Sequence, residues 1–206
     1  MPGIQQWLAT WAQLSLAQSA PQTDLYREVM YRYRAPRRCY HNEQHLDECF
    51  ACFRQVRAEA QHPAEIEMAI WFHDAVYDSS RQDNEERSAN WALCETTRFG
   101  VSREPAERIH SLILATRHDA APIAPDARIL VDVDLAILAA EPGRFDEYEK
   151  QVRQEYSWVP GFVFRRKRRE LLTRLLERPT IYSTGLFRAT FEPRARDNLR
   201  RSLEAL

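Results

Sequence analysis

Apolar residues recur every three or four positions along most of this chain, the spacing that places them on one face of an α-helix. The first such stretch carries Trp7, Trp11 and Leu14, which predicts an amphipathic helix near the start. Polar residues separate the later stretches, and Pro63 stands where proline favours the first turn of a helix. The patterns predict further helices at about residues 24–35, 43–60, 63–77, 85–98, 102–116, 128–140, 143–157 and 162–177, and a last one from 192.

Residues 131–135 fit two patterns, because their alternation of apolar and acidic residues is also that of a strand. Leu130, Asp134 and Leu138 nevertheless share a helical face, and the chain offers no second strand for pairing. We therefore predict an all-α helical bundle. Since no repeat, low-complexity tract or structureless linker interrupts the pattern, residues 1–206 are expected to form a single domain, with N-terminal helices and a C-terminal helical extension.

Composition limits the classes of function. With 206 residues, 44% of them hydrophobic, the chain is long enough for one sizeable core. The formal net charge of −1 gives no electrostatic case for nucleic acid as a partner, and no apolar run reaches the ~18 to 20 residues of a membrane span. Four cysteines without a disulfide framework fit a reducing cytoplasm, where we expect the protein to reside.

Two other motifs receive a structural interpretation. Cys49 and Cys52 form a C-x-x-C pair, a spacing found in redox and zinc sites, but no second pair accompanies it. Both cysteines share a helix face with Phe53 and Val56, so we assign them to the apolar core. The basic run at residues 165–169 lies inside an amphipathic helix and is interpreted as a solvated face.

The chemistry of the chain centres on His73 and Asp74, which stand side by side in an otherwise apolar segment. An ionised carboxylate removed from water is costly unless it is paired or binds a metal. His45 begins the apolar stripe of an earlier helix, and Asp134 is a further carboxylate among apolar residues. Imidazole nitrogen and carboxylate oxygen suit Mn, Fe, Co, Ni or Zn. The predicted metal ligands are therefore His45, His73, Asp74 and Asp134, with Asp132, expected closer to solvent or in a salt bridge, as the alternative to Asp134.

This set of residues, in this order, resembles the HD superfamily of metal-dependent phosphohydrolases. In that superfamily a histidine opens one helix, a His-Asp pair ends another, and an aspartate follows far along the chain. The chain also looks like a bacterial family, the predicted metal-dependent HD phosphohydrolases, and that resemblance covers nearly its whole length. The segments that carry it are 40–46, 71–78, 83–89, 112–116, 132–135, 181–182, 191–192 and 195–199. The resemblance implies the helical bundle of an HD domain.

The resemblance also implies a metal-dependent phosphohydrolase that cleaves a phosphomonoester or phosphodiester of a small molecule, with a nucleotide as the expected substrate. One divalent cation (Mn, Fe, Co, Ni, Zn or Mg) would be held by two histidines and two aspartates, with positions open for water and a phosphoryl oxygen. An acid or base must assist, and Asp78, one helical turn beyond Asp74 in the predicted helix, is the first candidate. Glu85 and Glu86 come next, across a polar loop. The predicted catalytic residues are thus Asp78, Asp74 and Glu85.

Three residues are candidates for contacting the substrate phosphate. Arg117 and His118 adjoin the end of a predicted helix, and a guanidinium can hold phosphate through two hydrogen bonds. His41, four residues before His45, is the third. His110 and His118 are the histidines that would serve a second ion. Two other functions stay open, a nucleotide-sensing module of the same fold without turnover and an HD-type di-iron oxygenase, and the sequence also leaves a homo-oligomer open.

Overall fold

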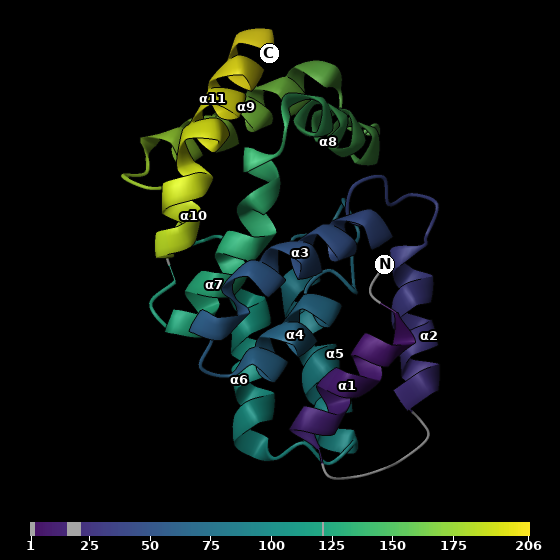
Figure 1. Ribbon diagram of the computed structural model, residues 1–206. Helices are drawn as coiled ribbons and strands as arrows, with labels where there is room; N and C mark the ends of the chain where they lie inside the picture. Colours follow the sequence, from purple (N-terminus) through teal and green to yellow (C-terminus); the bar gives the residue numbers. More distant parts are fainter. Residues whose placement is uncertain (1–2, 16–21, 121) are drawn as a thin grey trace. The chain divides into compact units, whose positions relative to one another are not determined.

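The computed structural model describes residues 3–15, 22–120 and 122–206, which form helices joined by loops with no strand among them (Figure 1). The all-α prediction is confirmed. The α-helices are α1 (Ile4–Leu14), α2 (Gln22–Tyr33), α3 (Glu43–Val56), α4 (Pro63–Phe72), α5 (Asn84–Arg98), α6 (Arg103–Ala115), α7 (Pro125–Asp134), α8 (Pro142–Glu155), α9 (Gly161–Glu177), α10 (Gly185–Thr190) and α11 (Glu192–Ala205). Two short 3-10 helices, η1 (Arg57–Glu59) and η2 (Leu135–Ala139), accompany them.

The chain divides into two compact units. The first ends at Val133, and the second runs from Asp134 to Leu206. The boundary falls where α7 passes directly into η2, so no loop separates the units along the chain. The single domain expected for residues 1–206 stays a prediction.

Helix α4 is the buried helix of the first unit. Every residue from Ala64 to Phe72 is buried, so this part of the helix has no solvated face. A helix that is apolar nearly all round must be enclosed by other elements, and α1, α3, α5 and α6 all pack against it. Because these contacts fix α4, they also fix the residues at its end, His73 and Asp74.

An aromatic cluster joins α1, α3 and α4. Trp71 is fully buried, and its ring centroid lies 5.3 Å from that of Trp7 and 4.8 Å from that of Phe50. Trp7 also meets Phe72, with centroids 6.0 Å apart. Rings of this size bury a large apolar area, and tilted or edge-on contacts suit their charge distribution. The apolar stripe of the first helix therefore packs on the end of α4 that precedes His73.

Two glutamates of α4 are buried, and each is held by an arginine from a neighbouring element. Glu65 accepts two hydrogen bonds from Arg108 of α6, at 2.7 and 2.8 Å. Glu67 accepts one from Arg57 Nε at 2.9 Å and another from the Thr10 hydroxyl at 2.8 Å. Buried carboxylates need such partners, because an unpaired charge away from water is strongly destabilising. The two pairs therefore set how α4 is turned about its axis.

Helix α4 ends at Phe72, whereas its apolar stripe predicts a helix that continues to residue 77. Arg38, buried in the connection between α2 and α3, donates to the carbonyl oxygens of Asp74 and Ala75. In a longer helix those carbonyls would accept bonds from the following turn. Arg38 supplies these hydrogen bonds in place of the next turn, and the helix does not continue. The prediction that Asp78 lies one helical turn beyond Asp74 is therefore wrong.

The second unit packs α8 and α11 against η2. Tyr182 Oη donates to the Leu135 carbonyl at 3.1 Å, and Asn198 Nδ2 donates to the carbonyls of Leu138 and Ala140 at 2.9 and 2.8 Å. Carbonyls at the end of a short helix lack helical partners. These two buried side chains therefore satisfy the backbone of η2 and tie it to the rest of its unit.

Most of the predicted helices lie within a few residues of the observed ones. The ambiguous segment at 131–135 is helical, as predicted, and α7 begins earlier than predicted, at Pro125. Helix α10 was not predicted. No helix among the described residues is long and apolar enough to cross a membrane.

Trp71→Ala removes the ring at the centre of the aromatic cluster, and we expect it to lower the free energy of unfolding by about 3 to 5 kcal/mol. Tyr31→Ala, at a tyrosine of the same unit that is 78% exposed, should change it by less than about 0.5 kcal/mol. Urea unfolding followed by circular dichroism measures both variants. Equally small effects would contradict the central place given to Trp71.

Candidate metal centre

His45 lies in the first turn of α3, where a side-chain cap holds the backbone. Asn42 Oδ1 accepts hydrogen bonds from the amides of Gln44 and His45, at 2.8 and 3.4 Å. Asparagine suits this position because its side chain satisfies amides that the helix leaves unbonded. The cap fixes the start of α3, and His45 is buried there, with only 2% of its surface exposed.

His73 follows the last residue of α4 and is equally buried. Its amide bonds to the Ala69 carbonyl at 2.8 Å, so α4 sets its position. The ring atom Nδ1 lies 2.8 Å from the carbonyl oxygen of Ile70. A carbonyl oxygen can only accept, so Nδ1 carries a hydrogen, and in the neutral ring Nε2 then keeps its lone pair. In metal-binding histidines, a hydrogen bond of this kind from the other ring nitrogen commonly orients the ring.

Three possible ligand atoms converge at the end of α4. The Nε2 atoms of His45 and His73 are 3.1 Å apart, and Asp74 Oδ2 lies 3.3 Å from the first and 3.1 Å from the second. Burial opposes ionisation of Asp74, but the charges and hydrogen bonds of His73, His41 and His45 outweigh it and hold its pKa well below the usual range. Asp74 is therefore a carboxylate in a largely buried place, where an unpaired charge would be costly.

These separations fit one shared divalent cation. With metal–ligand bonds of about 2.1 Å they correspond to angles of about 95 to 105° at the ion, which lie between octahedral and tetrahedral values. Two imidazoles and a carboxylate are donors suited to Zn, Fe, Co, Ni or Mn. Three of the four predicted metal ligands, His45, His73 and Asp74, thus lie together in a geometry that suits a metal.

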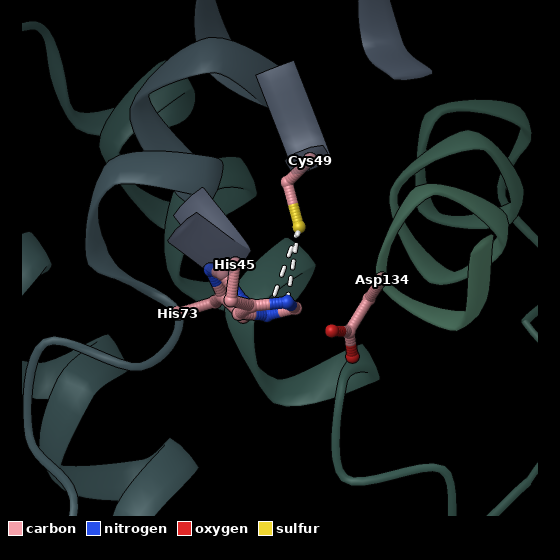
Figure 2. A group of neighbouring side chains, drawn as sticks. All are labelled: His45, Cys49, His73 and Asp134. Carbon is pink, nitrogen blue, oxygen red and sulfur yellow. Dashed lines mark hydrogen bonds between the residues drawn. The ribbon is translucent and has the colours of Figure 1, made fainter. Parts of the chain in front are cut away.

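Cys49 adds a fourth donor that the sequence analysis assigned only to the apolar face of α3. It is buried, and its Sγ lies 3.7 Å from Nε2 and 3.8 Å from Nδ1 of His45. One ligand atom from each of His45, Cys49 and His73 lies within 4.8 Å of the others, so this group could hold a metal ion (Figure 2). The signal in the sequence was the spacing of four residues, which places His45 and Cys49 on one helix face.

The neighbouring Cys52 does not belong to this group. Burial raises the pKa of its thiol to about 12, so the thiol stays protonated near neutral pH. A thiol ligates metals as the thiolate. The C-x-x-C pair is therefore divided, with one cysteine beside the histidines and the other among apolar residues.

Asp132 and Asp134 are the two candidates for the remaining predicted ligand. Asp132 is fully buried and does not lie near solvent, because residues 129–133 of α7 are buried on every face of the helix. The other expectation for Asp132, a salt bridge, stays a prediction. Asp134 is half-buried and ends α7, as the first residue of the second unit. The rest of α7 belongs to the first unit. Ligation by Asp134 stays a prediction.

Of the carboxylates predicted to be catalytic, Asp74 is one of the converging donors, whereas Asp78 and Glu85 are not. Asp78 is exposed in the loop after α4, where its Oδ1 accepts from the amide and the hydroxyl of Ser80, at 2.9 and 2.7 Å. These bonds lower the pKa of Asp78, so the group is ionised and engaged in a turn. Glu85 and Glu86 lie in the first turn of α5, where the helix dipole favours acids. The catalytic roles of Asp78 and Glu85 stay predictions.

His41 is the predicted substrate contact that the structure brings to the site. Its ring stacks on Tyr77 with centroids 4.1 Å apart, and its centroid lies 5.9 Å from that of His45. Arg38 donates to the His41 carbonyl at 3.2 Å, and its guanidinium lies 5.6 Å from the Tyr77 ring centroid. Neither Arg38 nor Tyr77 was predicted as part of the site. No local pattern marks Arg38, because Asp74, whose carbonyl it binds, is 36 residues further along the chain.

The remaining predicted contacts lie in and after α6. Arg117 Nε is 3.1 Å from a carboxylate oxygen of Asp119, and His118 adopts a positive φ of 57°. His110 Nε2 lies 3.1 Å from Asn90 Oδ1. In the part of the chain that the structure describes, neither histidine joins the group that could hold a metal. A second ion and the substrate contacts of Arg117 and His118 stay predictions.

No family model, no curated protein and no solved structure matches this chain. What the site can do therefore follows from its donor atoms: two imidazole nitrogens, a carboxylate oxygen and a buried sulfur. Such donors bind a divalent transition metal, and three or four protein ligands leave coordination positions for water or a substrate oxygen.

His73→Ala and Asp74→Ala each remove one converging donor, and we expect each to lower the affinity for a divalent transition metal by at least about 10- to 100-fold. His110→Ala removes a histidine outside the group and should keep the wild-type affinity. Metal titration and elemental analysis of the purified variants measure both. Wild-type metal content in His73→Ala would contradict this assignment.

Cys49→Ser tests whether the buried sulfur ligates. Cobalt(II) bound by a thiolate absorbs strongly in the near ultraviolet through charge transfer, so the wild-type cobalt protein should show this band and Cys49→Ser should lose it. Cys52→Ser, which alters a thiol outside the group, should keep it. A band that survives Cys49→Ser, or one that never forms, would show that Cys49 only packs beside the histidines.

Proposed function

We propose that this protein is a metal-dependent phosphohydrolase of the HD type that acts on a small phosphate ester, with a nucleotide as substrate. The observation that carries the proposal is the convergence of His45 Nε2, His73 Nε2 and Asp74 Oδ2 within 3.3 Å of one another. Their order along the chain, a histidine followed by a His-Asp pair, supports it further, because it is the order of the superfamily that the sequence resembles.

We assign the remaining protein ligand to Asp134. In the superfamily that the sequence resembles, the last aspartate precedes an apolar helix, and this favours Asp134. Asp132 lies two residues earlier and therefore points about 200° away around the helix axis. The two aspartates therefore cannot both face one ion.

The cation would lower the pKa of water and offset the negative charge that develops on a phosphoryl group. The residues of the chain hold the donors in place before substrate arrives. The Ile70 carbonyl fixes the ring of His73 through Nδ1, and Arg38 fixes the backbone of Asp74 through its carbonyl. Donors that are already in position need no reorganisation during the reaction.

His41 is our candidate for the residue that donates to the phosphate or protonates the leaving oxygen. Its ring stacks on Tyr77 and lies beside His45, so it is positioned near the proposed ion. Imidazole exchanges protons near neutral pH, as a general acid must. Asp78 is less suited to this role, because hydrogen bonds from Ser80 hold its carboxylate in the ionised form.

The protein loaded in turn with Mn, Co, Ni, Mg or Zn is expected to release phosphate from at least one compound in a panel of nucleotides, sugar phosphates and phosphodiesters. Asp74→Asn should lower kcat/KM by about 100-fold or more, because it weakens the ion's coordination. His41→Gln should lower kcat by about 100-fold, the contribution of a general acid, whereas Asp78→Asn should leave it within about threefold.

Absence of phosphate release with every metal would contradict the proposal. Tight nucleotide binding without turnover would favour the sensing module instead. Two irons per chain together with oxygen consumption would favour the di-iron oxygenase. A loss of activity in Asp78→Asn as large as that in His41→Gln would return the acid role to Asp78.

A further inference from the structure

A groove of about 640 Å³ lies beside the metal centre in the first unit. Its walls are the end of α2, the connection from α2 to α3 and the segment that follows Asp74, together with Arg87 of α5. Pockets of this volume accept small molecules of the size of a nucleotide. Asp78, which the sequence predicts to be catalytic, lies in this groove, but the sequence analysis gave no role to the arginines that line it.

Positive charge dominates the lining of the groove. The charged residues that line it are four arginines and one aspartate: Arg32, Arg34, Arg38, Arg87 and Asp78. Arg32 and Arg34 form ion pairs, at 2.8 and 2.9 Å, with two glutamates that do not line the groove. The Asp78 carboxylate accepts hydrogen bonds from Ser80. The lining therefore offers more guanidinium than carboxylate, as a site for an anion requires.

Two of the arginines supply most of this attraction. Arg38 is buried and donates to the carbonyl oxygens of Asp74 and Ala75. A buried charge is screened less than an exposed one. Arg87 is exposed, and its guanidinium forms no ion pair with any residue that the structure describes. It can therefore meet an incoming phosphate with two hydrogen bonds.

The groove adjoins the metal centre through the segment after α4. Ala75, which lines the groove, directly follows the ligand Asp74, and Tyr77, which also lines it, stacks on His41. Tyr31 lines it as well and is 78% exposed. An exposed aromatic ring beside a cationic groove suits a nucleotide, because the base can stack while the phosphates meet the arginines.

We propose that this groove binds the substrate as a nucleotide, with Arg87 contacting a phosphate group, Arg38 supplying a buried positive charge and Tyr31 stacking on the base. The delivery of that phosphate to the metal rests on the proposed function. Binding in the groove needs no metal, so it is tested separately from hydrolysis.

Calorimetric titration of ADP into the full chain, stripped of metal with EDTA, tests the groove. Arg87→Gln should weaken binding by about tenfold or more, the effect of losing one charge-assisted contact. Arg103→Gln is the matched control, because this arginine is exposed on α6 and does not line the groove. Tyr31→Ala should weaken binding of ADP but not of inorganic pyrophosphate, which has no base to stack. Circular dichroism checks that each variant folds.

Two results would overturn the groove as a nucleotide site: no binding of ADP to the metal-free protein, or equal affinity in Arg87→Gln and Arg103→Gln. If higher salt weakens ADP binding to the wild type, and weakens binding to Arg87→Gln by a smaller factor, the result would support the groove as a nucleotide site. If ADP binding depends on Arg87 but no substrate is turned over, the proposed hydrolase activity is refuted and the proposed nucleotide site in the groove is supported. Unchanged ADP binding in Asp74→Asn, alongside lost phosphate release, would support both proposals.

Discussion

Two imidazole nitrogens and a carboxylate oxygen that lie within 3.3 Å of one another in a buried place repel one another unless a proton or a cation lies among them. The residues around His45, His73 and Asp74 hold these three atoms in positions where one cation could bind all of them. The Asn42 cap fixes the start of α3, and the Ile70 carbonyl binds Nδ1 of His73 so that Nε2 keeps its lone pair. A proton could relieve the repulsion in part, but a divalent cation relieves it at all three atoms at once.

The scaffold explains why these atoms hold their positions. Helix α4 is buried along nearly its whole length, and its two buried glutamates are paired with Arg108 and Arg57. The helix then stops at Phe72, and Arg38 binds the carbonyls of Asp74 and Ala75 that the next turn would have used. The same arginine lines the groove next to the site. One buried guanidinium thus shapes the backbone at the metal centre and contributes charge to the proposed nucleotide site.

The features that were predicted correctly from the sequence are those that depend on residues close together along the chain. Helical periodicity identified most helices, and the apolar surroundings of His73 and Asp74 identified the centre of the site. It failed where distant residues decide the outcome. The apolar stripe suggested a helix to residue 77, but Arg38 ends it earlier, and this removed the geometric reason for choosing Asp78. Cys49 was assigned to the apolar core because a packing cysteine and a cysteine beside His45 would occupy the same position on the helix face. The sequence pattern therefore cannot separate the two roles. Asp132 was expected near solvent or in a salt bridge, but residues 129–133 of α7 are all buried, so it does not lie near solvent.

The central claim is that His45, His73 and Asp74 bind one divalent ion, and X-ray absorption at the zinc edge tests it most directly. In protein loaded with one equivalent of zinc, the spectrum reports the ligands themselves, because imidazole rings scatter in a characteristic way and oxygen and sulfur lie at different distances. Two imidazoles and at least one oxygen donor in the first shell are the predicted result. A first shell with no imidazole, or with water ligands alone, would contradict the account.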